Sequence, residues 1–152
     1  MTTLFQFELE GTEAHLCIPM SVRLKLDCCR MKVTTLQWQQ LSEEEKHLAT
    51  STPCQTADQR NAYRQLIGGI ILDRTGEPAG ELLPDPNPAW LNEHSIPKRV
   101  QDACRATDNE LTLGQWTTLT PLQRFALIKL TRPGHETASK FLQALKEFDL
   151  LT

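Results

Sequence analysis

An internal repeat constrains this chain more than any other feature of its sequence. Shifting the sequence by 78 positions aligns Ile18-Pro19 with Ile96-Pro97 and Gln37-Trp38 with Gln115-Trp116, and no gap is needed. The shift continues to the C-terminus, so that residues 18–72 correspond to residues 96–150. Solenoid units are usually roughly 20 to 50 residues long and stack in larger numbers. Two longer copies therefore indicate a duplicated small domain rather than an open array.

The first helix of each copy is predicted to follow a proline, which is well placed in a first helical turn. In the first copy the apolar residues then form one buried stripe, made of Ile18, Val22, Leu26 and Cys29. In the second copy the corresponding helix places Val100 and Cys104 four residues apart, on one face.

Capping sequences predict where the second helix of each copy begins. Ser42-Glu-Glu-Glu45 matches a capping box, and Thr120-Pro-Leu-Gln123 is a second cap with proline at the first helical position. Trp38 and Trp116 end the segments that precede these caps, and we expect both to be buried as core anchors. A last helix follows in each half, from about Ala57 to Leu72 and from about Glu136 to Leu150. Its inward residues are predicted to be Tyr63, Leu66, Ile67 and Ile70 in the first half, and Phe141, Leu142, Leu145 and Phe148 in the second.

These patterns predict a mainly α protein, a compact helical bundle of two pseudo-symmetric three-helix halves. A chain of 152 residues is long enough to bury a substantial core, so residues 1–152 are interpreted as a single domain. The alternating residues 4–9 predict a short N-terminal strand or extended arm. The proline-rich connection, residues 73–95, is predicted to be an ordered loop between the halves.

Composition argues against several classes of partner. The net charge of −3 and the pI near 5.8 do not supply the extended basic surface that nucleic acid requires. The longest apolar run is much shorter than a membrane span, and the N-terminal residues lack the pattern of a signal peptide. We therefore expect a cytoplasmic protein that binds neither nucleic acid nor membrane.

Catalytic and metal-binding patterns are not found in the sequence. The five cysteines include no Cys-x-x-Cys pair, and the four histidines lie in separate segments without metal-type spacing. Free cysteines in a reducing cytosol behave mostly as small buried hydrophobic residues, although the adjacent Cys28-Cys29 pair leaves a redox role open. No catalytic, cofactor-binding or metal-binding residue is predicted, and the protein is not expected to be an enzyme.

Longer motifs resemble one known family. The segments that carry the resemblance are Cys17-Ile-Pro-Met-Ser-Val-Arg-Leu-Lys-Leu-Asp27, Leu36-Gln-Trp38 with Leu41-Ser42, Thr52-Pro-Cys54 and Leu122-Gln-Arg-Phe-Ala-Leu-Ile-Lys-Leu130. Together they are similar to the nitrate reductase-associated protein family, which is best represented in cyanobacteria. The resemblance implies an accessory protein that supports the assimilatory, molybdenum-dependent nitrate reductase. It implies no catalytic residue and no cofactor.

Two functional hypotheses follow. The first is an interaction module that binds the reductase polypeptide, either as a maturation factor or as a lasting subunit. The second is a small redox or metal-carrying protein that serves the same enzyme through Cys17, Cys28, Cys29 and Cys54. Cysteine spacing favours the first hypothesis, because metal ligands normally lie on short turns. Leu24 falls outside the buried stripe and lies among charges. Either the N-terminal arm with Phe5 and Phe7 covers it, or Arg23, Leu24, Lys25 and Asp27 form part of the partner-binding surface, which is the role that we predict for them.

Overall fold

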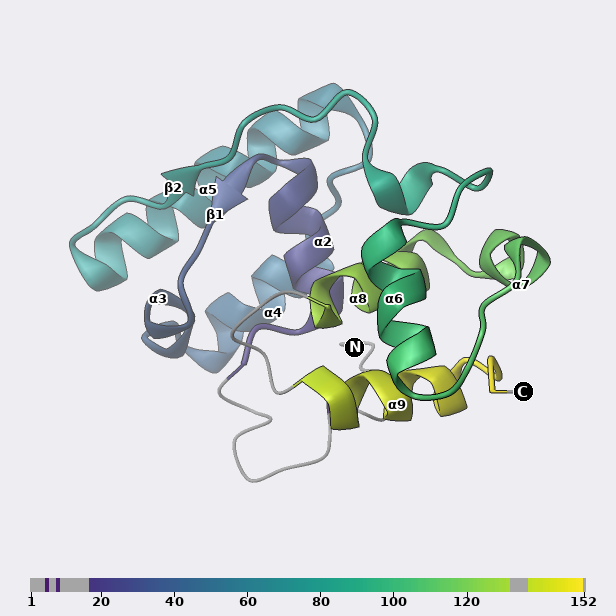
Figure 1. Cartoon of the computed structure of the whole chain (residues 1–152). Helices are drawn as coiled ribbons and strands as arrows, with labels where there is room; N and C mark the ends of the chain where they lie inside the picture. The colour runs from purple at the N-terminus through teal and green to yellow at the C-terminus, as the bar shows by residue number, and fades with distance from the viewer. Residues whose placement is uncertain (1–4, 6–7, 9–16, 132–136, 152) are drawn as a thin grey trace. The chain divides into compact units, whose positions relative to one another are not determined.

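The computed structural model describes residues 5, 8, 17–131 and 137–151 of the chain. These residues contain eight α-helices, one 3-10 helix and a two-stranded sheet, so the predicted mainly α class is confirmed. The chain divides into two compact units (Figure 1). Unit 1 comprises Met1–Leu4 and Glu8–Pro84, and unit 2 comprises Phe5–Phe7 and Asp85–Thr152. Whether the whole chain behaves as a single domain stays a prediction.

Each unit contributes four of the α-helices. Those of unit 1 are α2 (Met20–Cys28), α3 (Thr35–Gln39), α4 (Glu43–Ser51) and α5 (Ala57–Thr75). Those of unit 2 are α6 (Lys98–Ala106), α7 (Leu113–Thr118), α8 (Pro121–Leu130) and α9 (Thr137–Glu147). Unit 2 also holds the 3-10 helix η2 (Ala89–Leu91), which packs against α8 through the edge of the Trp90 ring on Phe125, with 5.0 Å between ring centroids.

The boundaries of the first three helices recur at the same shift as the sequence. Adding 78 to the bounds of α2 gives the bounds of α6, and the first residues of α3 and α4 give those of α7 and α8. The backbone conformation just after the first helix also recurs. Arg30 and Asp108, which are 78 positions apart, are both left-handed, with φ of 58° and 60°. Spatial superposition of the two halves stays a prediction.

Within the described residues, each half has four α-helices rather than the three that were predicted. Trp38 and Trp116 lie within the short helices α3 and α7, not in irregular connections. Thr34 and Thr112 cap these helices, and each accepts a hydrogen bond from the main-chain N–H of the glutamine three residues later. A five-residue helix is marginal by itself, and the reciprocal cap stabilises it.

The predicted caps of the longer helices are confirmed. Ser42 and Glu45 form a complete capping box at α4, and Thr120 and Gln123 form one at α8. At Glu45 the main-chain N–H of Ser42, together with the guanidinium of Arg74, holds the pKa of the carboxyl below its usual value.

The predicted core is largely confirmed. The stripe of Ile18, Val22, Leu26 and Cys29 is buried, as are Val100 and Cys104 on α6 and both tryptophans of the repeat. The prediction that Leu66 faces the core is wrong, because Leu66 is exposed and Ile71 is buried instead. The reason is that α5 continues past Leu72 to Thr75, so that Tyr63, Ile67 and Ile71 form its buried stripe at four-residue spacing.

A short β-ribbon attaches the start of the connection to unit 1. Strand β1 (Met31–Lys32) pairs antiparallel with β2 (Gly80–Glu81), with Met31 opposite Glu81 (Figure 1). A Cβ atom at Gly80 would lie 3.3 Å from the Cβ of Lys32, so this position favours glycine. Gly76, with φ of 76°, ends α5 in the left-handed conformation that glycine adopts readily. The predicted strand or arm at residues 4–9 lies, apart from Phe5 and Glu8, outside the described residues.

Candidate functional site

The four residues predicted to bind a partner lie on α2, and all four are half-buried. The Nε of Arg23 donates a hydrogen bond of 2.8 Å to the carbonyl oxygen of Ile18. Leu24 and its charged neighbours are thus partly covered by the rest of the protein rather than fully exposed. Their role in partner binding stays a prediction, but the structure assigns at least two of them contacts inside unit 1.

Lys25 closes the C-terminal end of α4. The last carbonyl groups of a helix have no partner within the helix, and Pro53 has no N–H to offer them. The Lys25 ammonium donates hydrogen bonds of 2.5 Å to the carbonyl oxygen of Thr50 and 2.7 Å to that of Thr52. Buried carbonyl groups without a partner are costly, so Lys25 links α2 to α4 and stabilises unit 1.

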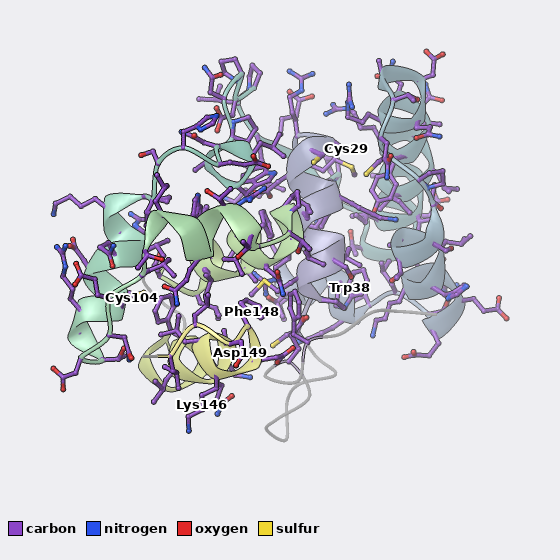
Figure 2. The ribbon with its side chains drawn as sticks, turned by 90° about the vertical axis from the view of Figure 1, so that its right-hand side faces the viewer. Cys29, Trp38, Cys104, Lys146, Phe148 and Asp149 are labelled. Atoms are coloured by element: carbon purple, nitrogen blue, oxygen red, sulfur yellow. The ribbon has the colours of Figure 1, made fainter. Side chains whose placement is uncertain are left out.

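Two cysteines that are distant in the sequence lie in the core of unit 1. Cys29 follows the last residue of α2, and Cys54 lies in the loop between α4 and α5. Both belong to the core of unit 1, where Cys29 is 2% exposed and Cys54 is 9% exposed. Figure 2 shows Cys29 at the end of its helix with other sulfur atoms drawn beside it.

Two cations flank Cys54 along the chain. Lys25 is bound to the carbonyl of Thr52, two residues before Cys54, and Arg60 donates a hydrogen bond of 2.8 Å to the carbonyl of Gln55, the residue after it. The Cys29 thiol, followed by the charges of Lys25 and Arg60, lowers the pKa of Cys54, although burial opposes this.

The pKa values of three other groups in this core shift in the opposite direction. The interaction with Cys54, followed by burial, raises the pKa of the Cys29 thiol, and burial is the main reason that the pKa of Cys28 is raised. Burial also raises the pKa of the Tyr63 hydroxyl, with further contributions from Cys54 and Cys29. In this core the pKa of Cys54 is lowered, whereas the pKa values of Cys28, Cys29 and Tyr63 are raised.

The remaining cysteines do not join this cluster. Cys17 is exposed, and Cys104 is buried in α6, where burial raises the pKa of its thiol to about 11. Within the described part of the chain, no group of three or more metal-binding side chains is placed to hold an ion. In the same residues, no helix has both the length and the apolar character that crossing a membrane requires.

The sequence grouped Cys17, Cys28, Cys29 and Cys54 as candidates for a redox or metal-carrying role, but their spacing indicated no particular pairing. Arg60 was missed entirely. The sequence does contain one relevant signal, Thr52-Pro53. A proline after a helix has no N–H to donate, so the last carbonyl groups of the helix need another hydrogen-bond donor, such as a neighbouring lysine or tyrosine. That signal indicates a cationic side chain near Cys54 without identifying it as Lys25.

These features define a mainly helical protein in which the same order of helices occurs twice. Two buried cysteines, Cys29 and Cys54, lie in the core of unit 1. The chain belongs to the conserved nitrate reductase-associated protein family, whose model matches residues 4–148. No curated protein and no solved structure matches the chain.

Proposed function

We propose that the protein is a non-enzymatic accessory protein that binds the assimilatory, molybdenum-dependent nitrate reductase and supports its maturation or activity. The family match carries this proposal, because it spans residues 4–148 and the family's name states an association with nitrate reductase. The same proposal places the protein in the cytoplasm, where the assimilatory enzyme would meet it.

The proposal is tested by binding and by activity. The full chain, immobilised through a tag, should retain the reductase polypeptide from a defined mixture and raise the activity of the reductase when the two are combined. Comparing cofactor-free with cofactor-loaded reductase separates the two forms of the proposal. A maturation factor should prefer the cofactor-free polypeptide, whereas a lasting subunit should bind both. Binding to neither form would contradict the proposal.

The proposed docking surface is the exposed part of α2 around Arg23, Leu24, Lys25 and Asp27. Lys25 also closes α4, so charge reversal at Lys25 would destabilise unit 1 and confuse the result. A sharper variant is Leu24→Ser, because Leu24 is half-buried and outside the core. Its counterpart in the second half is Asp102, and Asp102→Ser is the matched control. Undiminished reductase binding by a folded Leu24→Ser protein would remove this surface from consideration.

The alternative function is a small cysteine-based redox or metal-carrying protein serving the same enzyme. The observation behind the redox form of this alternative is that Cys29 and Cys54 lie in the core of the same unit. An absorption spectrum and a metal analysis of anaerobically purified protein distinguish the metal-carrying form, which would contain a stoichiometric metal.

A further inference from the structure

One face of α4 in unit 1 is open to solvent, although the corresponding face of α8 in unit 2 is covered. An open hollow on α4 is lined by four exposed side chains, those of Glu43, Glu44, His47 and Leu48. The positions 78 residues later, on α8, are occupied by Pro121, Leu122, Phe125 and Ala126. Phe125 and Ala126 are 0% exposed, whereas Leu48 is 39% exposed. The repeat therefore covers this helical face in one copy and leaves it open in the other.

The element that covers the face in unit 2 is the 3-10 helix η2. The ring of Trp90 lies edge-on against Phe125, and the Nε of Arg124 donates a hydrogen bond of 2.7 Å to the carbonyl oxygen of Trp90. The counterparts of Arg124 and Phe125 in unit 1 are Lys46 and His47. One short turn with one large apolar side chain is therefore the kind of element that this helical face accommodates.

The sequence of the chain does not supply such an element for α4. The residues 78 positions before η2 are Gly11, Thr12 and Glu13, which lie outside the described residues. They include no aromatic and no large aliphatic side chain, and Glu13 has the same charge as Glu43 and Glu44. We therefore expect the occupant of the hollow to come from another molecule.

The charge of the hollow narrows the choice of occupant. The side chain of Glu43 is 95% exposed and lies 3.8 Å from the ammonium of Lys46, which compensates part of its charge. Glu45 is already bound to Arg74. Glu44 forms no ion pair within the part of the chain that the structure describes. A cation beside Glu44 would be attracted and a second carboxylate repelled, so a basic segment fits the hollow and an acidic one does not.

We propose that the hollow on α4 binds a short basic segment of another protein, in which a large apolar side chain packs on Leu48 and a neighbouring lysine or arginine pairs with Glu44. An apolar anchor with a polar rim is the usual arrangement of a protein interface. The hollow lies in the N-terminal half of α4, whereas Lys25 binds at the C-terminal end of that helix. The hollow is therefore distinct from the surface proposed on α2. The proposal specifies the chemistry of the segment and not the protein that carries it, so it stands or falls separately from reductase binding.

Two synthetic peptides test the proposal on the full chain. Both consist of residues 86–94, which include η2 and its tryptophan, with a fluorescent dye at the N-terminus. The probe peptide is made basic by Asn92→Lys and Glu93→Lys, and the unchanged peptide is the matched control. In fluorescence anisotropy at low salt, the probe should bind about tenfold more tightly than the control, because only the probe has cations for the acidic rim. Equal affinities, or no binding of the probe at about 1 mM, would overturn the proposal.

Substitutions on α4 identify the hollow as the binding site. Leu48→Ser should weaken binding of the probe about fivefold, because it removes the apolar anchor. Glu44→Gln should weaken it about threefold, because it removes the partner of the cation. Leu36→Ser, at a leucine of α3 that is 71% exposed, is the matched control in the same unit and should leave the affinity unchanged. Undiminished binding by a Leu48→Ser protein whose circular dichroism is unchanged would contradict the proposal.

Two further measurements separate this proposal from its neighbours. Leu24→Ser should leave binding of the probe unchanged, and a loss of binding in Leu24→Ser but not in Leu48→Ser would place the peptide on α2 and overturn the proposal. Sedimentation of the protein without peptide distinguishes a second copy of the chain as the occupant. We expect the same sedimentation coefficient for wild-type and Leu48→Ser proteins. A dimer that Leu48→Ser dissociates would make the hollow an interface between copies, against the proposal.

Salt provides the last check on the role of charge. Raising the salt concentration from about 0.05 M to about 0.5 M should bring the affinities of the two peptides together, because exposed charge pairs are screened. The contribution of the apolar anchor should remain, so Leu48→Ser should still weaken both peptides. A preference for the basic peptide that does not change with salt would contradict the proposed pairing with Glu44.

Discussion

The hydroxyl of Tyr63 donates a hydrogen bond of 2.7 Å to the carbonyl oxygen of Ala49, inside the core of unit 1. In an uninterrupted helix this carbonyl would accept from the N–H of residue 53, but residue 53 is proline. Tyr63 therefore replaces a main-chain donor that the sequence removes. The counterpart of Tyr63 in the second half is Phe141, and the counterpart of Pro53 is Thr131, which has an N–H.

Tyr63→Phe should lower the free energy of unfolding by about 1 to 3 kcal/mol, because it leaves the buried Ala49 carbonyl without a donor while preserving the ring. A denaturant titration measures the change. Gln65→Ala, at an exposed position of the same helix, should change stability by less than about 0.5 kcal/mol. Equal effects of the two substitutions would show that the hydrogen bond is not important.

Arg124→Met should destabilise unit 2 by about 3 kcal/mol. The guanidinium of Arg124 is 2% exposed and donates hydrogen bonds of 2.7 Å and 2.9 Å to the carbonyls of Trp90 and Leu119. Removing it leaves these carbonyl groups unsatisfied. Its counterpart Lys46 lies 5.9 Å from the centroid of the Trp38 ring and binds no buried carbonyl that is described, so Lys46→Met should cost less than about 1 kcal/mol. A larger cost for Lys46→Met would contradict this ranking.

Replacement of either repeated tryptophan by alanine should cost about 3 to 5 kcal/mol, because both rings are buried. Trp116 also loses the hydrogen bond of 2.8 Å from its indole N–H to the carbonyl of Asn92. Leu91→Ala, at an exposed position, serves as the control in the same titration. Unchanged stability together with lost reductase binding would instead make the tryptophans recognition residues.

Fluorescence tests the prediction of a single domain. Trp38 reports on unit 1, whereas Trp90 and Trp116 report on unit 2. In a Trp38→Phe variant the fluorescence comes from Trp90 and Trp116 in unit 2. If the chain is one cooperative domain, the unfolding midpoint of this variant should equal that of the wild-type protein, after correction for any loss of stability. Two separate transitions in circular dichroism would show that the units unfold independently.

Alkaline pH should destabilise the protein through its buried thiols. Burial favours the neutral form of Cys104 and raises its pKa from 9.0 to about 11 in the folded state. Its contribution to stability is therefore complete below about pH 9 and is lost as the pH rises towards 11. Tyr63 and Cys29 act in the same direction in unit 1. Cys104→Ala should reduce the slope of stability against pH in this range, and a denaturant titration at several pH values measures this slope.

Local signals in the sequence were sufficient for most helices. The caps at Ser42 and Thr120 depend on residues three apart, and the buried stripe of α2 depends on residues four apart, so both could be predicted without tertiary information. The caps of α3 and α7 have the Thr-x-x-Gln form of the cap at Thr120, so they could also have been predicted from the sequence. They were missed because the helices they start are only five and six residues long.

Tertiary contacts could not be predicted in this way. The β-ribbon joins two-residue strands almost fifty positions apart, too short to produce an alternating pattern. The candidate site depends on Lys25 reaching Thr50 and Thr52, and that contact depends on how α2 packs against α4. The partner-binding role of Lys25 stays a prediction, whereas its hydrogen bonds to the end of α4 could not be predicted from the sequence.

The left-handed residues Arg30 and Asp108 have a consequence for how the two halves can differ. Neither is glycine, so each conformation costs about 1 kcal/mol and persists because the surrounding main chain requires it. In unit 1 the carbonyl of Arg30 accepts from the N–H of Leu82, and in unit 2 the N–H following Asp108 donates to the carbonyl of Cys104. The path of the backbone is thus specified independently of the side chain at the bend. An arginine at this bend in one half and an aspartate at the corresponding bend in the other can therefore carry opposite charges while both keep the left-handed conformation.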